Sequence, residues 1–141
     1  MMGGRQLLTL NDECADEGKQ VAIHELMHAF GKNSSQNTSN ILYSMYFTSS
    51  GIHHEHMRVD RDKYITINET AISEVSQYRV QRKAQAQMLR DWFDFKSIML
   101  YNPIQNIMKS KIPGQPMLNM TQKPIMSDGD IENLRVLYSC Y

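Results

Sequence analysis

The chain has 141 residues, and its 15 Lys and Arg balance its 15 Asp and Glu, so the formal net charge is zero. A neutral chain gives no electrostatic argument for binding nucleic acid or a membrane surface, and no apolar run approaches the ~20 residues of a membrane span. The length has room for one modest domain, and the opening MMGGRQLLTL lacks the pattern of a signal peptide.

The first two predicted elements are a short strand and a helix. Three leucines within residues 5–10 precede a group of turn residues, which is consistent with a short strand. Apolar residues then recur at helical spacing from Lys19 to Phe30, and Gly31 is suited to end a helix.

This predicted helix contains the pentapeptide HELMH at residues 24–28. Helix positions four apart lie on one face, so the imidazoles of His24 and His28 can reach a single metal ion. Glu25 projects from a neighbouring angle and can accept a proton from a metal-bound water, as a metallopeptidase requires. The alternative is an amphipathic helix with two ordinary polar histidines, because a pattern this short recurs by chance.

A second group of histidines follows in GIHHEHMRVDRD, residues 51–62. Catalytic zinc sites take three protein ligands and a water, and metzincins take the third ligand from a histidine beyond the glycine that ends the helix. This second group therefore favours a zinc site over a merely polar helix. We expect His53 and His56 to be solvated and to lie outside that site, with His56 a spare ligand if the stretch between Gly31 and Ile52 is a real loop.

Three further stretches complete the chain. A helix is predicted from Glu69 to about Arg90, and prolines divide residues 102–126 into loop and short extended pieces. Asp128-Gly129-Asp130 then introduces a final predicted helix, Ile131 to Tyr138. No internal repeat is present.

Four separated motifs resemble those of the astacin peptidases, a family of the metzincin clan. HELMHAFG followed by HEHMRVDRDKY resembles the family pattern HExxHxxGxxHExxRxDRDxY, and FDFKSIMLY at 93–101 resembles its YDYxSIMHY Met-turn segment. Leu134, Tyr138 and Cys140 resemble the family's final helix and closing cysteine, and GGRQ with Cys14 resembles the stretch before the active-site helix. The resemblance runs nearly end to end.

The resemblance implies an α+β fold over residues 1–141, in the form of a partial metzincin-type catalytic domain. Its parts would be the active-site helix and the helix- and loop-rich C-terminal subdomain, with most of the N-terminal sheet missing. The implied function is that of a secreted, zinc-dependent metalloendopeptidase that hydrolyses peptide bonds of proteins. The alternatives are a non-catalytic zinc-binding fragment and a faulty gene model of such a peptidase.

The resemblance also implies a set of site residues. His24, His28 and His54 would hold Zn²⁺, Glu25 would act as the general base, and Tyr101 would help to stabilise the oxyanion. The implied partner is a protein or peptide substrate, with no role for nucleic acid or membrane.

The Met-turn segment both matches the family and departs from it. Met99 would form an apolar floor beneath the histidines. Leu100 stands where the family has a histidine, and Phe93 and Phe95 replace two tyrosines, which keeps aromatic packing and removes two hydroxyls.

The resemblance implies further pairings. Glu55 would pair with an amino terminus released by removal of a propeptide. Cys14 and Cys140 would pair with different partners, both in an N-terminal half that this chain does not have. Structural charge pairs, rather than substrate contacts, are expected for the charged residues that follow the second histidine group, namely Arg58, Asp60, Arg61 and Asp62.

An atypical insertion at residues 32–51 interrupts the family spacing. Its removal restores HELMHAFG-IHHEHMRVDRD, and this register makes His54 the third ligand. One interpretation is a surface loop, whose closure costs on the order of 2–3 kcal/mol. The favoured interpretation is a translated, retained intron, because Gly31-Lys32 can be encoded with a splice donor and removal preserves the reading frame.

Overall fold

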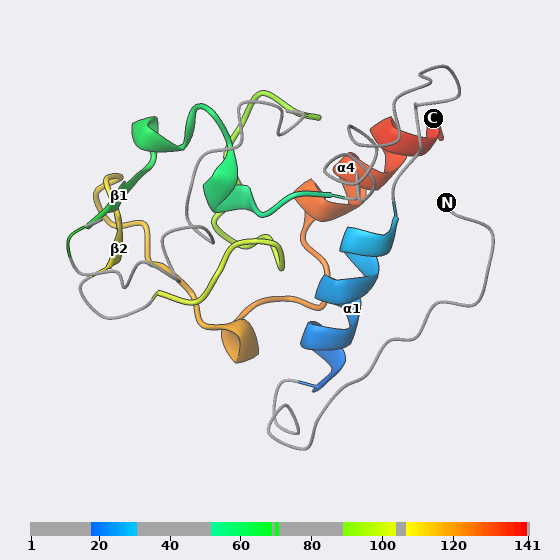
Figure 1. Cartoon of the computed structure of the whole chain (residues 1–141), viewed down its shortest axis with the longest axis horizontal. Coiled ribbons are helices and arrows are strands. Elements are labelled where there is room, and N and C mark those ends of the chain that lie inside the picture. The colour runs from blue at the N-terminus through cyan, green and yellow to red at the C-terminus, as the bar shows by residue number, and fades with distance from the viewer. Residues whose placement is uncertain (1–17, 31–51, 69, 71–88, 104–106, 141) are drawn as a thin grey trace, which may run out of the picture.

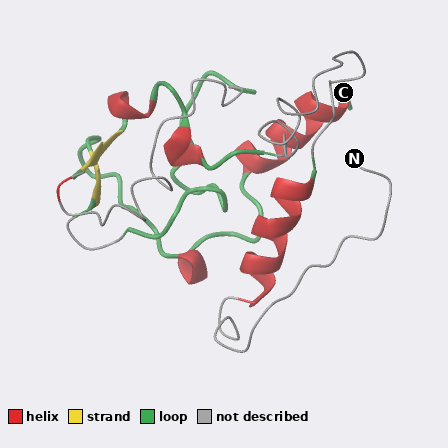
Figure 2. Cartoon of the chain, in the orientation of Figure 1, coloured by secondary structure: helices red, strands yellow, loops and turns green. Residues whose placement is uncertain are grey.

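The computed structural model describes residues 18–30, 52–68, 70, 89–103 and 107–140. Within these residues the α+β composition expected from the sequence is confirmed (Figures 1 and 2). None of the described helices has both the length and the apolar character needed to cross a membrane. The elements are, in chain order, α1 (Gly18–Ala29), η2 (Glu55–Met57), η3 (Arg61–Lys63), β1 (Ile65–Ile67), β2 (Met108–Ser110), η5 (Met120–Gln122) and α4 (Asp128–Tyr138), where η marks a short 3-10 helix.

Helix α1 is displaced by one residue at each end from the predicted Lys19–Phe30. It buries the side chains of His24 and Met27, and Met27 is fully enclosed by other apolar side chains. Phe30 still donates its backbone amide to the carbonyl of Leu26, so the last turn is closed at 2.9 Å. One face of α1 thus carries both a core methionine and a candidate ligand.

The described chain resumes at Ile52 directly against the end of α1. The amide of Ile52 donates to the carbonyl of Met27 at 3.0 Å, and both side chains belong to one core cluster. In a Schellman motif, the amide of the second residue after the C-cap donates to the carbonyl three residues before the C-cap. With Phe30 as the C-cap, that carbonyl belongs to Met27. Ile52 therefore takes the position that a residue two places after Phe30 would have.

Helix α4 begins three residues before the predicted start at Ile131, because Ser127 caps it. The Ser127 hydroxyl accepts from the amide of Asp130 at 3.1 Å, and the Asp130 carboxylate accepts from the amide of Ser127 at 3.0 Å. Because of this reciprocal capping box, residues 128–130, which the sequence suggests as a turn, form the first turn of the helix. At Gly129 a Cβ atom would lie 2.4 Å from Asp94 Oδ2, so the close approach of two segments requires glycine.

The sheet is small and lies at the opposite end of the molecule from α1 and α4 (Figure 1). β1 and β2 pair antiparallel, with Ile65 opposite Ser110 and Ile67 opposite Met108. β2 lies in the stretch predicted as loop and short extended pieces. β1 was not predicted, because three residues are too few for an alternating pattern to be recognised.

The Met-turn segment lies between two apolar clusters. The first contains Met27, Ile52, Ile98, Met99 and Met120. The second contains Ile65, Phe93, Phe95, Leu100 and Met108, and the two phenylalanine rings that replace the family's tyrosines meet edge to face. Because consecutive side chains enter different clusters, the backbone of this segment is fixed from both sides.

Some of the predicted features fall outside the described residues. These are the strand at 5–10, the insertion at 32–51, Cys14 and nearly all of the helix from Glu69 to Arg90. The last two residues of that predicted helix, Leu89 and Arg90, are described and form a bend. In the described part of the chain Cys140 is exposed and not in a disulfide.

Candidate metal centre

Three histidines from two parts of the chain converge on one point. His24 and His28 project from consecutive turns of α1, and His54 comes from the segment that follows Ile52. The Nε2 atom of His54 lies 3.0 Å from Nε2 of His24 and 3.0 Å from Nε2 of His28. Nitrogen atoms bound tetrahedrally to one zinc ion at ~2.0–2.1 Å would be about 3.3 Å apart, so the three rings fit a single ion.

Backbone carbonyls orient two of these rings. Nδ1 of His24 lies 2.8 Å from the carbonyl oxygen of Ile98, and Nδ1 of His28 lies 2.9 Å from that of Ile52. A carbonyl only accepts, so we infer that both Nδ1 atoms carry the proton and that both Nε2 atoms present lone pairs. A cation shared by the three Nε2 atoms would satisfy these lone pairs. Neutral histidines whose other ring nitrogen donates to a backbone carbonyl are typical zinc ligands.

The other expected site residues lie around this triad. The Tyr101 ring is half-buried, with its centroid 4.3 Å from that of His54 and 6.2 Å from that of His24. Met99 is fully buried in the cluster that also holds the α1 residue Met27. Glu25 is exposed on α1, where solvent and a bound chain can reach it.

The expectation that His56 is solvated is wrong. Its side chain is fully buried, stacked on His54 with centroids 5.1 Å apart, and its ring centroid lies 4.3 Å from that of Tyr101. The short helix η2 turns the backbone so that this ring faces inward. His53, by contrast, is half-buried and is not among the three converging histidines.

Glu55 is a buried carboxylate next to the candidate ligand His54. Its Oε1 atom accepts from the amide of Asp94 at 2.9 Å and lies 2.8 Å from Nη2 of Arg90 and 3.4 Å from Nη1 of Arg58. Burial raises the pKa of Glu55, and the Arg90 cation, the amide and Arg58 oppose that rise. In the described residues these are the groups that meet the carboxylate. The expected pairing of Glu55 with an amino terminus stays a prediction.

The expected structural charge pairs are present. Arg58 holds Asp60 in a bidentate contact at 2.9 and 3.0 Å, and Nε of Arg61 lies 3.5 Å from a carboxylate oxygen of Asp62. The hydrogen bond from Arg58 lowers the pKa of Asp60, against a smaller effect of burial. These contacts join neighbouring residues of the segment that follows His54, so they stiffen the backbone beside a candidate ligand.

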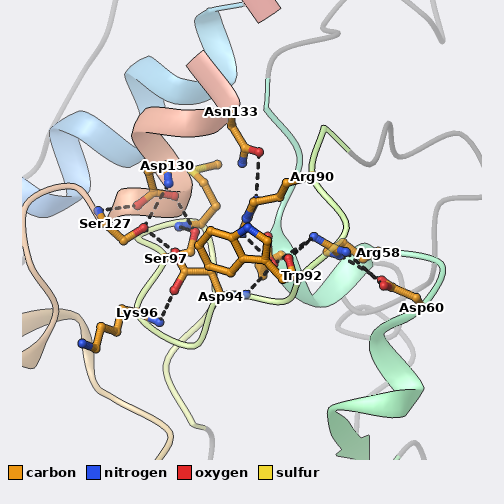
Figure 3. Close-up of polar contacts among 12 residues, drawn as sticks. Arg58, Asp60, Arg90, Trp92, Asp94, Lys96, Ser97, Ser127, Asp130 and Asn133 are labelled. Atoms are coloured by element: carbon orange, nitrogen blue, oxygen red, sulfur yellow. Dashed lines mark hydrogen bonds and ion pairs between the residues drawn. The ribbon is translucent and has the colours of Figure 1, made fainter. Parts of the chain in front are cut away.

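A buried polar network that the sequence reasoning missed joins α4 to the Met-turn. Asp130 accepts from the Ser97 hydroxyl at 2.6 Å and from the Ile98 amide at 2.9 Å. The Ser127 hydroxyl donates to Asp94 at 2.6 Å (Figure 3). Because Ile98 also accepts from His24, the start of α4 supports a candidate ligand through one residue of the Met-turn. The capping-box spacing of Ser127 and Asp130 was the available sequence signal.

Comparisons with known proteins show the family of this chain. A family model described as Astacin, a peptidase family, matches residues 39–139. Astacin-like metalloprotease toxin 2 of Loxosceles intermedia is 36% identical over 110 residues, which cover 71% of this chain and 42% of the relative. Zinc metalloproteinase nas-13 of Caenorhabditis elegans is 28% identical over 144 residues, covering 99% of this chain and 27% of the relative.

A solved structure supports the same relationship. High choriolytic enzyme 1, a hatching enzyme zinc-protease from Oryzias latipes, superposes with a TM-score of 0.55 at 29% identity. The match covers 66% of this chain and 48% of that chain. The chain thus spans less than half the length of each of these relatives.

Proposed function

Because the chain belongs to the astacin family of peptidases, we propose that it is a zinc-dependent metalloendopeptidase that hydrolyses protein or peptide substrates. The observation that carries the proposal is the convergence of His24, His28 and His54, whose ligand atoms all lie within 4.8 Å of one another. Two nitrogen donors oriented by backbone carbonyls and a third from a separate segment form the kind of donor set that Zn²⁺ takes in peptidases.

Each residue has a role that its position supports. When bound, zinc lowers the pKa of a coordinated water to about 7 and polarises a carbonyl. Glu25, exposed beside the first ligand on α1, takes the proton from the attacking water and then delivers it to the leaving amine. The phenol of Tyr101, whose ring packs against His54, donates a hydrogen bond to the oxyanion as it forms.

An extracellular site of action is part of the proposal. Its support is the kind of relative that the chain matches, which includes astacin-like metalloprotease toxins 1 and 2 of Loxosceles intermedia.

The decisive test separates metal binding from hydrolysis. Glu25→Gln keeps the shape of the side chain and removes the base, so we expect zinc content to stay at the native level and peptide hydrolysis to fall by about 10²–10⁴-fold. Zinc is measured by elemental analysis and hydrolysis with a quenched fluorescent peptide. Glu132→Gln on α4 is the matched control and is expected to leave both unchanged.

Three results would count against the proposal. Full activity in Glu25→Gln would refute the assigned base. Stoichiometric zinc without any hydrolysis by the native chain would favour the non-catalytic zinc-binding alternative. Absence of zinc from the native chain would refute the metal centre itself.

A further inference from the structure

We propose that Arg90 is a positioning residue for the metal centre: its guanidinium is the buried counter-charge that holds Glu55 and, through Glu55, the neighbouring ligand His54. The inference rests on the proposed zinc-dependent function and goes beyond it by assigning a role to a residue outside the histidine motifs. Arg90 lies in the bend that precedes the Met-turn segment.

The first step concerns charge and burial. The side chains of Glu55 and Arg90 are 3% and 4% exposed, and their charged atoms meet at 2.8 Å. A carboxylate removed from water to this degree requires a paired charge, since an unpaired one is strongly disfavoured. Loss of the Arg90 cation would therefore drive Glu55 away from its present position.

The second step links Glu55 to the ligand. Glu55 follows His54 directly in the chain, and its amide donates to the carbonyl of Met99 at 2.9 Å. Its carboxylate also accepts the amide of Asp94. A movement of Glu55 therefore strains the short backbone segment that sets the position of the His54 ring, whose Nε2 lies 3.0 Å from two other nitrogens.

The third step is that Arg90 is itself held in place. Its Nη1 atom donates to Oδ1 of Asn133 on α4 at 2.8 Å, and its guanidinium carbon lies 4.7 Å from the centroid of the Trp92 ring (Figure 3). The cation thus joins α4 to the ligand segment. Such a fixed charge can determine where Glu55 settles.

Arg58 does not replace Arg90 in this role. Its Nη1 atom is 3.4 Å from Glu55, against 2.8 Å for Arg90. Its other donors are already engaged by the two carboxylate oxygens of Asp60, and Nη1 also donates to the carbonyl of Trp92. Arg90 is therefore the principal counter-charge of Glu55, because its contact is shorter and its guanidinium is not shared with a second carboxylate.

The contact between Arg90 and Glu55 acts mainly through charge. Nη2 lies 2.8 Å from the carboxylate, so the two opposite charges are in direct contact. A lysine at this position would keep the charge while losing the contact to Asn133 or the stacking on Trp92. Arg90→Lys should therefore retain part of the function that Arg90→Met loses.

The test uses the full chain, with Zn²⁺ and Co²⁺ alone as probes. We expect Arg90→Met to weaken zinc binding by about 10–100-fold and to change the visible absorption of bound Co²⁺, which reports ligand geometry. Arg90→Lys should fall between Arg90→Met and the native chain. Arg135→Met is the matched control and should bind as the native chain does, because Arg135 is an exposed arginine on α4 that lines one surface hollow together with Arg90.

A double variant keeps the inference testable if Arg90→Met does not fold. Glu55→Gln combined with Arg90→Met leaves no unpaired buried charge at this pair, so we expect it to fold and to bind zinc more tightly than Arg90→Met alone. Circular dichroism of the metal-free chains identifies any variant that is unfolded. A double variant that folds and binds zinc no better than a folded Arg90→Met contradicts the proposed charge pairing.

The remaining outcomes separate this inference from the proposed function. If the native chain binds zinc and Arg90→Met matches Arg135→Met in zinc affinity and cobalt spectrum, the positioning role is wrong and the function stands. A loss of thermal stability without change in those two quantities also overturns it, because the role would then be structural only. If the native chain binds no zinc, both proposals fail.

Discussion

Two adjacent histidines, His53 and His54, differ in what the fold does with them. His54 lies 3.0 Å from both α1 ligand nitrogens and packs against Tyr101, whereas His53 is half-buried and is not among the converging rings. Residue type is identical, so the difference comes entirely from the direction in which the backbone presents each side chain.

This difference gives a paired prediction. His54→Ala removes one of three ligands and should reduce zinc binding below detection at micromolar metal, because two imidazoles hold zinc far more weakly than three. His53→Ala should bind zinc as the native chain does. Equilibrium dialysis with elemental analysis measures both, and zinc kept by His54→Ala but lost by His53→Ala would overturn the ligand register.

At Asp60 the structure predicts a pH dependence of stability. The hydrogen bond from Arg58 lowers the pKa of this carboxylate in the folded chain relative to the unfolded one. A lowered folded-state pKa means that the stabilisation is fully present above the ordinary Asp pKa of about 4 and disappears as pH falls through the folded value.

The Asp60→Asn variant tests this directly. Its melting temperature should lie below that of the native chain at neutral pH, and the gap should close on acidification, because the native carboxylate then becomes neutral as well. Thermal unfolding is followed from neutral to strongly acidic pH with a chelator present, so that metal release does not contribute. A gap that stays constant over this range would show that the Arg58 contact does not act through charge.

At the scale of elements, the start of α4 supports the metal centre. Ser127 caps the helix and also donates to Asp94, and Asp130 in the first turn holds the amide of Ile98, the residue whose carbonyl meets His24. Helix caps contribute about 0.5–2 kcal/mol, and leaving a buried acceptor without its donor adds about 1–3 kcal/mol. The helix start is therefore coupled to the position of a candidate ligand.

Substitution of Ser127 by Ala tests this coupling. We expect a loss of about 2–4 kcal/mol in the free energy of unfolding, since a cap and a buried hydrogen bond disappear together. Gln122→Ala is the control, because Gln122 accepts from the amide of Asn119 at an exposed position and should cost less than ~0.5 kcal/mol. Urea unfolding measures both, and equal effects would show that burial of the cap is unimportant.

At the scale of the whole molecule, the candidate ligands come from two segments that residues 32–51, the predicted insertion, separate in sequence. The hydrogen bond from Ile52 to Met27 places the second segment where a residue two after Phe30 would lie. The fold of the described residues therefore has no geometric need for the inserted length between these two points.

A chain lacking residues 32–51 should consequently fold and bind zinc. We expect an affinity equal to that of the full chain or tighter, because removing the insertion saves on the order of 2–3 kcal/mol of loop-closure free energy. Zinc titration of the two chains provides the comparison. Loss of zinc binding on deletion would show that the insertion is an integral part of the domain, and transcript reads across this region test the intron interpretation separately.

The sequence by itself indicated the family and the candidate ligands, because the motifs that carry the resemblance each lie within one short segment. His24 and His28 are four positions apart, and a helix of the predicted extent puts them on one face. The Met-turn motif and the charge pairs after Glu55 were also readable, since each lies within one short segment.

Only the tertiary structure decided how distant segments meet. Three features join residues that are up to 45 positions apart, and no local sequence pattern predicts them. They are the burial of His56 against Tyr101, the ion pair of Arg90 with Glu55, and the hydrogen bond from Ile98 to Asp130. Such contacts follow from the way two apolar clusters enclose the Met-turn, which fixes its backbone and so the polar groups around it. Short-range spacing specified the chemistry, and long-range packing specified its geometry.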